Sequence, residues 1–267
     1  MRKRRRWSSI ERDLRETAGP LLAGVDEVGR GPLAGPVVAC AVIMPPNERA
    51  IRGVDDSKRL TAPVRERLAE RIRARALGVG LGAASVREIE RLNIYHASTL
   101  AMRRALRRLP IAPNHIVIDG RAIRTLEIPH TAVVHGDARC FSVACASIIA
   151  KVTRDRLMVS LARRYGGYGW ERNVGYATPD HITGLTAHGI TPHHRRSFFR
   201  VSQLSLDLDS PASPLMWASG EGPIPAAALE IVLTDVARPI DADGWVPLAI
   251  DLPDRSPPSS APHPGPT

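Results

Sequence analysis

The chain has 267 residues and a formal net charge of +10, which its two parts share very unequally. Residues 1–201 hold 35 lysines and arginines against 18 acids, a balance of +17, whereas residues 202–267 hold 2 against 9, a balance of −7. Such a basic domain favours a polyanionic partner, although an arginine-rich composition on an ordinary surface is an equal alternative. The apolar fraction of 43% is typical of a globular protein, and the absence of a long apolar run excludes a transmembrane helix.

The first residues form a basic segment, residues 2–6, and a polar stretch follows in place of the apolar core of a secretory signal. We therefore interpret residues 1–19 as a solvated basic arm of a cytoplasmic protein. The three cysteines, Cys40, Cys140 and Cys145, include no CxxC pair. Buried reduced thiols are thus favoured over disulfides or zinc ligands.

Strand-like and helix-like apolar segments alternate between residues 20 and 201. Closely spaced runs predict an antiparallel meander with strands at Leu21–Val28, Pro36–Ile43 and Leu77–Ala84. One helix is expected at Thr61–Ala76, capped by Thr61 and with Pro63 in its first turn. A second helix, Ile94–Leu109, is expected to end at Pro110.

Two further short runs, His115–Ile118 and Thr131–Val134, each stop at a glycine next to an aspartate, as buried strands do at a turn. The segment Phe141–Leu161 then has the apolar spacing of a helix packed on a sheet. Antiparallel strands followed by strand–helix crossovers predict an α/β fold with a mixed sheet flanked by helices. Residues 202–267 are expected to be an acidic, Pro-rich and largely disordered tail, with a short helix possible at Ala226–Val236.

Acidic residues end three of the predicted strands, at Asp26 and Glu27, at Asp119 and at Asp137. Strand ends beside glycine turns are where α/β sheets bind ligands. Converging carboxylates repel one another unless they are neutralised, and hard oxygen ligands favour Mg²⁺ or Mn²⁺. Two such ions can activate water and stabilise the leaving oxygen in phosphodiester hydrolysis. Each aspartate alone is better explained as a turn cap, so the prediction depends on their joint placement.

The pair Asp26 and Glu27 poses a geometric problem, because neighbouring residues of a regular strand point to opposite faces. A bulge or the strand end must turn one of them, which the glycines that follow make feasible. Asp155 competes with Asp137 as the fourth ligand. Lys151, four residues before Asp155, favours a surface ion pair instead.

Taken together, these segments resemble the motifs of the ribonuclease HII family (type 2 ribonucleases H). The matching segments are Val25–Val37, Asp56–Thr61, Ile118–Gly120, Gly136–Ala138, Ala146–Asp155, Gly175–Thr178 and His194–Phe198. The resemblance covers about residues 20–201 and implies a ribonuclease H-like catalytic domain there, with a five-stranded mixed sheet and a helical C-terminal part. It also implies an endonuclease that hydrolyses the RNA strand of RNA–DNA hybrids and cuts 5′ of single ribonucleotides in duplex DNA, leaving 3′-hydroxyl and 5′-phosphate ends.

The resemblance also implies a role for individual residues. The carboxylates that bind Mg²⁺ or Mn²⁺ and carry catalysis correspond to Asp26, Glu27, Asp119 and Asp137. The substrate-binding residues correspond to Gly29, Arg30, Gly31, Ser57, Lys58 and Tyr176. The backbone of the glycine segment is expected at the ribose 2′-hydroxyl, the group that distinguishes RNA from DNA. Tyr176 is expected to pack on the sugar at an RNA–DNA junction, and Ser57 and Lys58 to contact phosphate.

Some residues keep simpler explanations or depart from the family pattern. Arg30 alone would be a solvated charge, Tyr176 alone would be core packing, and residues 193–196 are more simply a basic patch than metal ligands. His135 stands where lysine is usual, and Ala177 where glycine or proline is common. Their effects stay open.

Beyond the matched domain, residues 203–208 (QLSLDL) resemble the short peptide by which bacterial replication proteins bind the sliding clamp. Alternatively, these leucines pack on the domain itself.

We expect the protein to be a monomer. The rivals to the main hypothesis are a type 3 ribonuclease H, a DDE-type recombinase and a hybrid-binding protein without catalysis. The first would need an extra N-terminal domain, the second an acid on the last helix, and the third would not need four carboxylates.

Overall fold

A five-stranded sheet in the order β3-β2-β1-β4-β5 forms the centre of the computed structural model, which describes residues 7–198 and residue 201. The strands are β1 (Leu22–Val28), β2 (Val37–Ile43), β3 (Gly78–Ala84), β4 (His115–Asp119) and β5 (Thr131–Val133). β1, β2 and β3 are antiparallel neighbours, whereas β4 and β5 run parallel to β1. The predicted mixed sheet is therefore confirmed.

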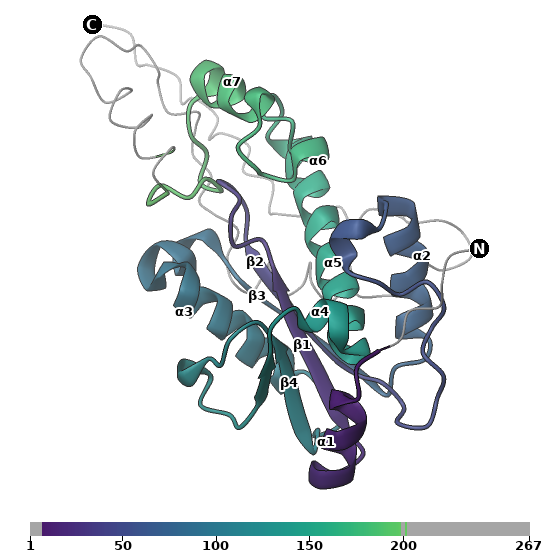
Figure 1. Ribbon diagram of the computed structural model, residues 1–267. Helices are drawn as coiled ribbons and strands as arrows, with labels where there is room; N and C mark the ends of the chain where they lie inside the picture. The colour runs from purple at the N-terminus through teal and green to yellow at the C-terminus, as the bar shows by residue number, and fades with distance from the viewer. Residues whose placement is uncertain (1–6, 199–200, 202–267) are drawn as a thin grey trace, which may run out of the picture.

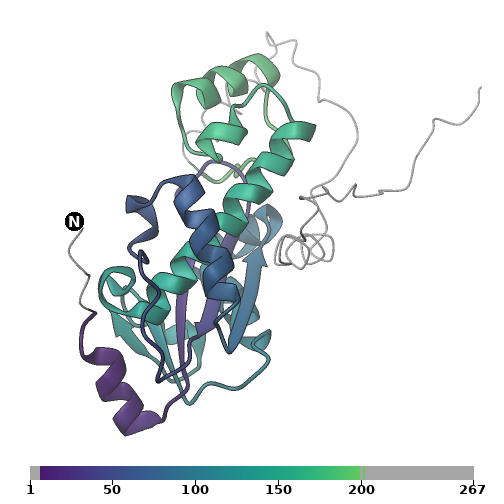
Figure 2. The same ribbon diagram turned by 90° about the vertical axis from the view of Figure 1, so that its right-hand side faces the viewer.

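Helices cover both faces of this sheet (Figure 1). The helices are α1 (Ile10–Ala18), α2 (Ala62–Arg73), α3 (Val86–Arg107), α4 (Gly136–Arg139), α5 (Phe141–Arg164), α6 (Trp170–Asn173) and α7 (Pro179–His188). α3 packs on one face, and α5 and α2 pack on the other. In both views α6 and α7 extend the molecule at the far end of α5, as the implied helical C-terminal part requires (Figure 2).

Alternation along β2 explains why the sheet is buried on both sides. Val38, Cys40 and Val42 face α2 and α5, and the residues between them face α3. Glycines bring the two long helices close to the strands. A Cβ on Gly24 of β1 would lie 2.2 Å from the backbone of Ser142 in α5, so the start of α5 rests directly on β1.

Helix α3 begins at Val86 rather than at the predicted Ile94. A capping box between Ser85 and Glu88 starts it, and Asn93, with φ 64° and ψ 167°, interrupts its helical geometry. The apolar faces before and after this kink do not follow one 3.6-residue period, so the sequence pattern revealed only the second part. Thr61 occupies the predicted N-cap of α2 without a side-chain hydrogen bond.

The arm predicted at residues 1–19 is not solvated throughout, since residues 10–18 form α1 and Glu11 is buried. The three cysteines are free and buried, as expected. Among the described residues, no helix combines the length and apolarity that a membrane crossing requires. The predicted tail, its helix at Ala226–Val236 and the 203–208 motif lie outside the described residues.

Candidate active site

Asp26 and Glu27 lie at the point where β1 separates from β4. The register between β1 and β2 continues without a bulge to Val28, whereas the last pair between β1 and β4 joins Val25 and Ile118. Of the two alternatives, a bulge is therefore absent, and the two carboxyl groups leave opposite faces of β1. Beyond Val25, β4 no longer runs beside β1, so both carboxyl groups can approach Asp119 and Asp137. The end of the strand pair, the second alternative, therefore explains how both acids reach one site.

Asp26 is buried on the α5 side of the sheet, with Ser147 as a hydrogen-bond partner. Its Oδ1 accepts the backbone N–H of Glu27 at 2.8 Å. Burial, together with repulsion from Glu27 and Asp119, raises the pKa of Asp26 well above its ordinary value. A bare carboxylate is thus poorly tolerated here without a cation.

Glu27 points toward the glycine segment that follows β1. Its Oε1 lies 3.1 Å from a guanidinium nitrogen of Arg30. Burial raises the pKa of Glu27, Arg30 opposes this increase, and Asp119 adds to it. Arg30 therefore connects Glu27 to the glycine loop that follows β1.

Asp119 from the neighbouring strand and Asp137 from the helix after β5 make up the acid cluster together with Asp26 and Glu27. Asp119 ends β4, and its Oδ1 accepts the backbone N–H of Gly136 at 2.6 Å. Asp137 follows in α4 and is buried. Burial and then repulsion from Asp119 raise its pKa, while Lys58, with Nζ 3.8 Å from Oδ2, lowers it.

These four side chains form an all-oxygen donor set whose electrostatics fit a divalent cation. Burial and mutual repulsion both disfavour their charged forms, and Mg²⁺ or Mn²⁺ would relieve both effects. Within the part of the chain that the structure describes, no three His, Cys, Asp or Glu side chains lie close enough together to hold a metal ion as they stand. The fit of the four acids to a divalent cation therefore rests on their donor chemistry and their mutual electrostatic effects.

Two buried arginines hold the glycine loop that follows β1. Arg195 donates to the carbonyl oxygens of Gly29 at 2.5 Å, Arg30 at 2.9 Å and Gly35 at 2.8 Å. Arg154 donates in the same way to the oxygens of Ala34 at 3.0 Å and Pro36 at 2.9 Å. Both side chains are fully buried, so the loop conformation is fixed from inside the protein.

The interpretation of residues 193–196 as a basic patch is therefore wrong for three of its four members. His193, His194 and Arg195 are buried, and only Arg196 is exposed. Burial lowers the pKa of His193 to about 4, so its ring is neutral near neutral pH. The segment packs on the loop after β1 through an isolated bridge between Ala34 and His194.

Tyr176 lies beside the glycine loop and is 44% exposed. A Cβ built on Gly31 would lie 3.9 Å from its ring atom Cε1, so the ring and the loop border the same surface. His181 holds the backbone of Tyr176, with Nδ1 2.9 Å from the Tyr176 carbonyl oxygen. Core packing, the simpler explanation of this residue, is excluded by its exposure.

Ser57 and Lys58 have different environments. Ser57 is buried and its hydroxyl lies 2.8 Å from that of Ser147. Its expected contact with phosphate stays a prediction. The Lys58 side chain is 82% exposed and extends over the acids. Partial burial works against its charge, but the carboxylates, Asp137 foremost, raise the pKa of Lys58.

Asp155 takes no part in the acid cluster. It pairs with Lys151 at 2.7 Å and with Arg65 at 3.4 Å. The ion-pair interpretation is confirmed, and Asp137 rather than Asp155 stands beside Asp119.

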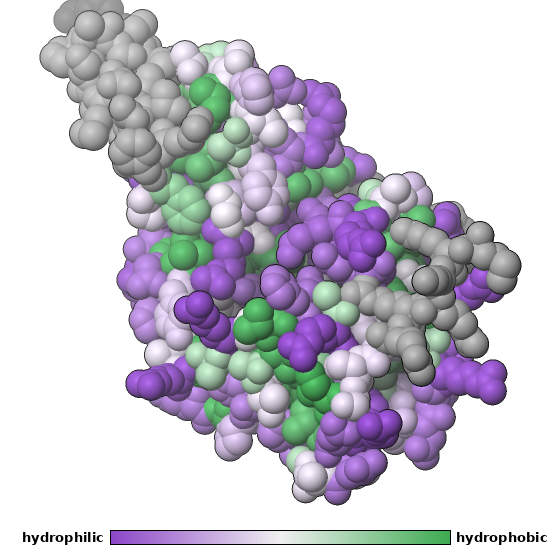
Figure 3. All heavy atoms as spheres, in the orientation of Figure 1, coloured by the Kyte–Doolittle hydropathy of each residue, from purple (hydrophilic) through white to green (hydrophobic). Residues whose placement is uncertain are grey.

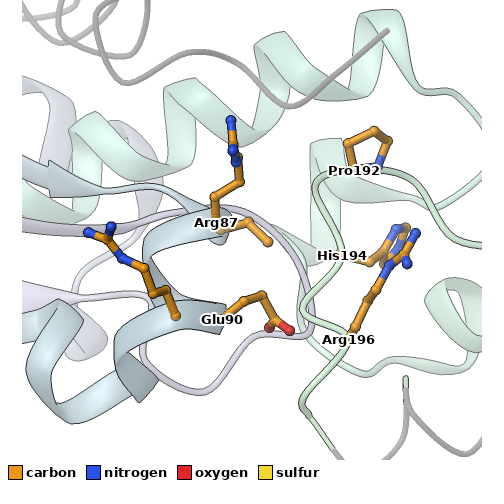
Figure 4. A pocket seen from close by; sticks show the side chains of 7 residues that line it. Arg87, Glu90, Pro192, His194 and Arg196 are labelled. Carbon is orange, nitrogen blue, oxygen red and sulfur yellow. The ribbon is translucent and has the colours of Figure 1, made fainter. Parts of the chain in front are cut away.

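A hollow of about 570 Å³ lies between the start of α3 and residues 192–196, the segment that includes Arg195 (Figure 4). Its lining residues are Val86, Arg87, Glu90, Arg91, Pro192, His194 and Arg196. Glu90 accepts hydrogen bonds from the amide and hydroxyl of Ser197 at 3.0 and 2.8 Å, so its charge holds the wall of the hollow. The remaining charged side chains are arginines. The face shown in Figure 3 mixes hydrophilic residues with a strip of hydrophobic ones in its lower centre.

Sequence reasoning missed Arg154, Arg195 and Glu11. For Arg154 a signal was available, because it interrupts an otherwise apolar or small stripe of α5 that includes Ala150 and Met158. A charged residue in such a stripe indicates a buried polar anchor. Arg195 and Glu11 follow no such periodic pattern.

Comparison with known proteins agrees with this geometry. The family model described as "Ribonuclease HII" matches residues 23–202. A ribonuclease HII of Granulibacter bethesdensis is 56% identical over 195 residues, which are 72% of this chain and 89% of that protein. A ribonuclease HII of Gluconobacter oxydans is 55% identical over 190 residues, which are 70% of this chain and 91% of that protein.

Solved structures show the same fold. The ribonuclease H2 of Pyrococcus horikoshii superposes with a TM-score of 0.63 at 28% identity, covering 71% of this chain and 99% of that one. The ribonuclease HII in a PCNA complex from Archaeoglobus fulgidus gives 0.57 at 28% identity, covering 67% and 95%. With a matching family model and relatives above half identity, the chain belongs to the ribonuclease HII family of hydrolytic nucleases.

Proposed function

We propose that this protein hydrolyses the RNA strand of RNA–DNA hybrids and cuts 5′ of single ribonucleotides in duplex DNA, with two Mg²⁺ or Mn²⁺ ions, leaving 3′-hydroxyl and 5′-phosphate ends. One observation carries the proposal. An acid cluster lies directly beside a glycine loop whose carbonyls are held by Arg195. A metal site next to the accessible, rigid backbone of this loop fits a phosphodiesterase that recognises a sugar hydroxyl.

Asp26, Glu27, Asp119 and Asp137 would hold the ions. When bound, the ions would supply an activated water and stabilise the leaving 3′-oxygen. The Bst ribonuclease HIII, solved in complex with Mn²⁺, has the same fold at 21% identity and a TM-score of 0.56, a likeness that extends to the fold alone.

The chain's own groups would select the substrate. The backbone of Gly29 and Gly31 would lie close to the ribose 2′-hydroxyl, because neither residue has a side chain to keep the sugar away. The ring of Tyr176 would pack on the adjacent deoxyribose. Lys58 would contact a phosphate, because its ammonium group is exposed next to the acids.

One cleavage assay tests the proposal. The protein is incubated with a DNA duplex that contains one ribonucleotide, with Mg²⁺, with Mn²⁺ and with a chelator. We expect a single cut 5′ of the ribonucleotide with either metal, and loss of cutting with the chelator or in Asp119→Asn. Cutting that survives Asp119→Asn, or an all-DNA duplex cut equally well, would contradict the mechanism.

We also propose that residues 203–208 bind a sliding clamp. The support is their QLxLxL pattern and the solved complex of PCNA with the ribonuclease HII of Archaeoglobus fulgidus. A pull-down with purified clamp compares the full chain with the double variant Gln203→Ala, Leu206→Ala. Equal retention of both proteins would exclude this role.

A cytoplasmic monomer that acts in ribonucleotide excision repair and DNA replication completes the proposal. The support for a reducing compartment is that Cys40, Cys140 and Cys145 are buried free thiols. Size-exclusion chromatography with light scattering measures the mass, and a dimer would contradict the monomer.

A further inference from the structure

The N-terminal segment that includes α1 contacts the junction between α4 and α5. Its Ile10 and Leu14 pack on a small apolar cluster that includes Cys140 and Val143. Trp7, just before α1, packs on the ring of Phe141 at a centroid distance of 5.5 Å. The start of the described chain is therefore docked on the beginning of the longest helix.

Glu11 provides the polar part of this contact. Its carboxylate accepts the backbone N–H of Phe141 at 3.0 Å and that of Ser142 at 2.8 Å. It also accepts the hydroxyl of Ser142. Glu11 is only 6% exposed. A buried carboxylate that receives three donors is a specific structural feature, because an unpaired one would be strongly disfavoured.

These bonds perform the task of a helix cap. Cys140 is the N-cap residue of α5 and makes no side-chain cap hydrogen bond. The first N–H groups of a helix have no partner within it, and the helix dipole favours an anion there. Glu11 supplies both the acceptor and the charge from a segment about 130 residues away in sequence.

The capped junction leads directly to Asp137. Ser8 donates both its N–H, at 3.0 Å, and its hydroxyl, at 2.8 Å, to the carbonyl of Arg139 in α4. α4 consists of residues 136–139, so the N-terminal segment holds the helix that carries Asp137 and the start of the helix that follows. Asp119 fixes the opposite end of α4 through the Gly136 amide.

We infer that Glu11 is a positioning residue, which keeps α4, and with it Asp137, in place beside Asp119 for metal binding. The inference rests on the proposed function, because it takes Asp137 as a metal-binding carboxylate. Because the acids repel one another, α4 needs contacts outside the acid cluster to keep its place. Ser8 and Glu11 supply such contacts.

The test compares Glu11→Ala and Glu11→Gln with Glu16→Ala, which removes an exposed carboxylate from the same helix. Mn²⁺ affinity is measured without substrate, from the electron paramagnetic resonance signal of the free ion. Amide hydrogen exchange is followed at residues 136–143. Cleavage of the single-ribonucleotide duplex is measured over a range of Mg²⁺ concentrations.

We expect Glu11→Ala to weaken Mn²⁺ binding about tenfold, as loss of an outer contact to a metal ligand commonly does. Exchange at Phe141 and Ser142 should accelerate on the order of tenfold. kcat at limiting Mg²⁺ should fall while KM for the duplex stays unchanged. Glu11→Gln keeps one acceptor and should give intermediate values, and Glu16→Ala should match the wild type.

Faster exchange with unchanged Mn²⁺ affinity would reduce Glu11 to a structural role and overturn the inference. Unchanged exchange would overturn it as well. If Glu11→Ala does not fold, Glu11→Gln decides between these outcomes. A wild-type protein that binds Mn²⁺ but cuts no ribonucleotide-containing duplex would contradict the proposed function alone, since the exchange and affinity data do not depend on cleavage.

Discussion

Replacement of Arg195 by lysine should both destabilise the protein and impair recognition of the ribonucleotide. Arg195 is fully buried and makes four hydrogen bonds to three carbonyl oxygens, those of Gly29, Arg30 and Gly35. A lysine ammonium has three donors that radiate from one atom, so it cannot reproduce the planar arrangement of these contacts. At least one carbonyl would lose its partner.

The magnitude follows from opposing effects. Hydrogen bonds to a charged group contribute about 1.5–3 kcal/mol each. Burial, and then the nearby Arg154, lower the pKa of Arg195 to about 9, which means that its charge is itself held at a cost. Breaking one side of a buried charged network typically costs about 3–5 kcal/mol. For a domain of this size that loss lowers the unfolding temperature by roughly 10 °C.

Two measurements on Arg195→Lys test this reasoning, with Arg196→Lys as the control because Arg196 is adjacent and exposed. Thermal unfolding should give the temperature change above. Below that transition, cutting at a single ribonucleotide should fall by about tenfold or more, since misplacement of about 1 Å is enough for such a loss. Arg196→Lys should leave the unfolding temperature unchanged. An Arg195→Lys variant with wild-type unfolding and wild-type cleavage would show that the loop is held by other contacts.

Three further predictions follow from the site. Tyr176→Ala should impair cutting at an RNA–DNA junction more than cutting within an all-RNA strand, with unchanged Mn²⁺ affinity; equal loss on both substrates would refute its junction role. The double variant Arg87→Gln, Arg91→Gln should weaken duplex binding and reduce the slope of log affinity against log salt by about 1–2. The control Arg107→Gln, at the other end of α3, should leave both unchanged. Identical slopes for the double variant and the wild type would exclude the hollow as a phosphate contact. Burial lowers the pKa of His193 to about 4 from its ordinary 6.5, so the unfolded state takes up the proton first. Stability should therefore be complete above pH 6.5 and decline between pH 6.5 and pH 4 by up to roughly 3 kcal/mol; urea unfolding that is independent of pH across this window would contradict the buried neutral ring.

Local patterns predicted the sheet well and located the four acids after its strands. The strands of the meander, the runs before Asp119 and Asp137 and the long helix α5 were all recognised, because alternation, apolar period and turn residues act over a few neighbours. The same patterns located α3 only from Ile94 onward, since the kink at Asn93 breaks the period. They also treated residues 10–18 as arm, because the docked face of α1 is short and its buried residue is a glutamate.

The geometry of Asp26 and Glu27 illustrates a different limit. Sequence shows that two adjacent acids need an irregularity, but it does not show which one. The glycines that follow Glu27 are compatible both with a bulge and with the end of a strand pair. The structure resolves the choice through β4, which leaves β1 after Val25. The partner strand that decides the matter lies about 90 residues further along the chain.

The polar groups that hold the site were hidden for a related reason. Glu11, Arg154 and Arg195 are charged residues, which a composition-based reading assigns to the surface. Each is buried because backbone groups of distant segments supply its hydrogen bonds, and such partners have no period in the sequence. In the proposed mechanism the acid cluster supplies the chemistry, and these three residues fix the backbone on either side of it. The specificity of the enzyme for a ribose should accordingly depend on the buried arginines, and its affinity for metal on the buried glutamate.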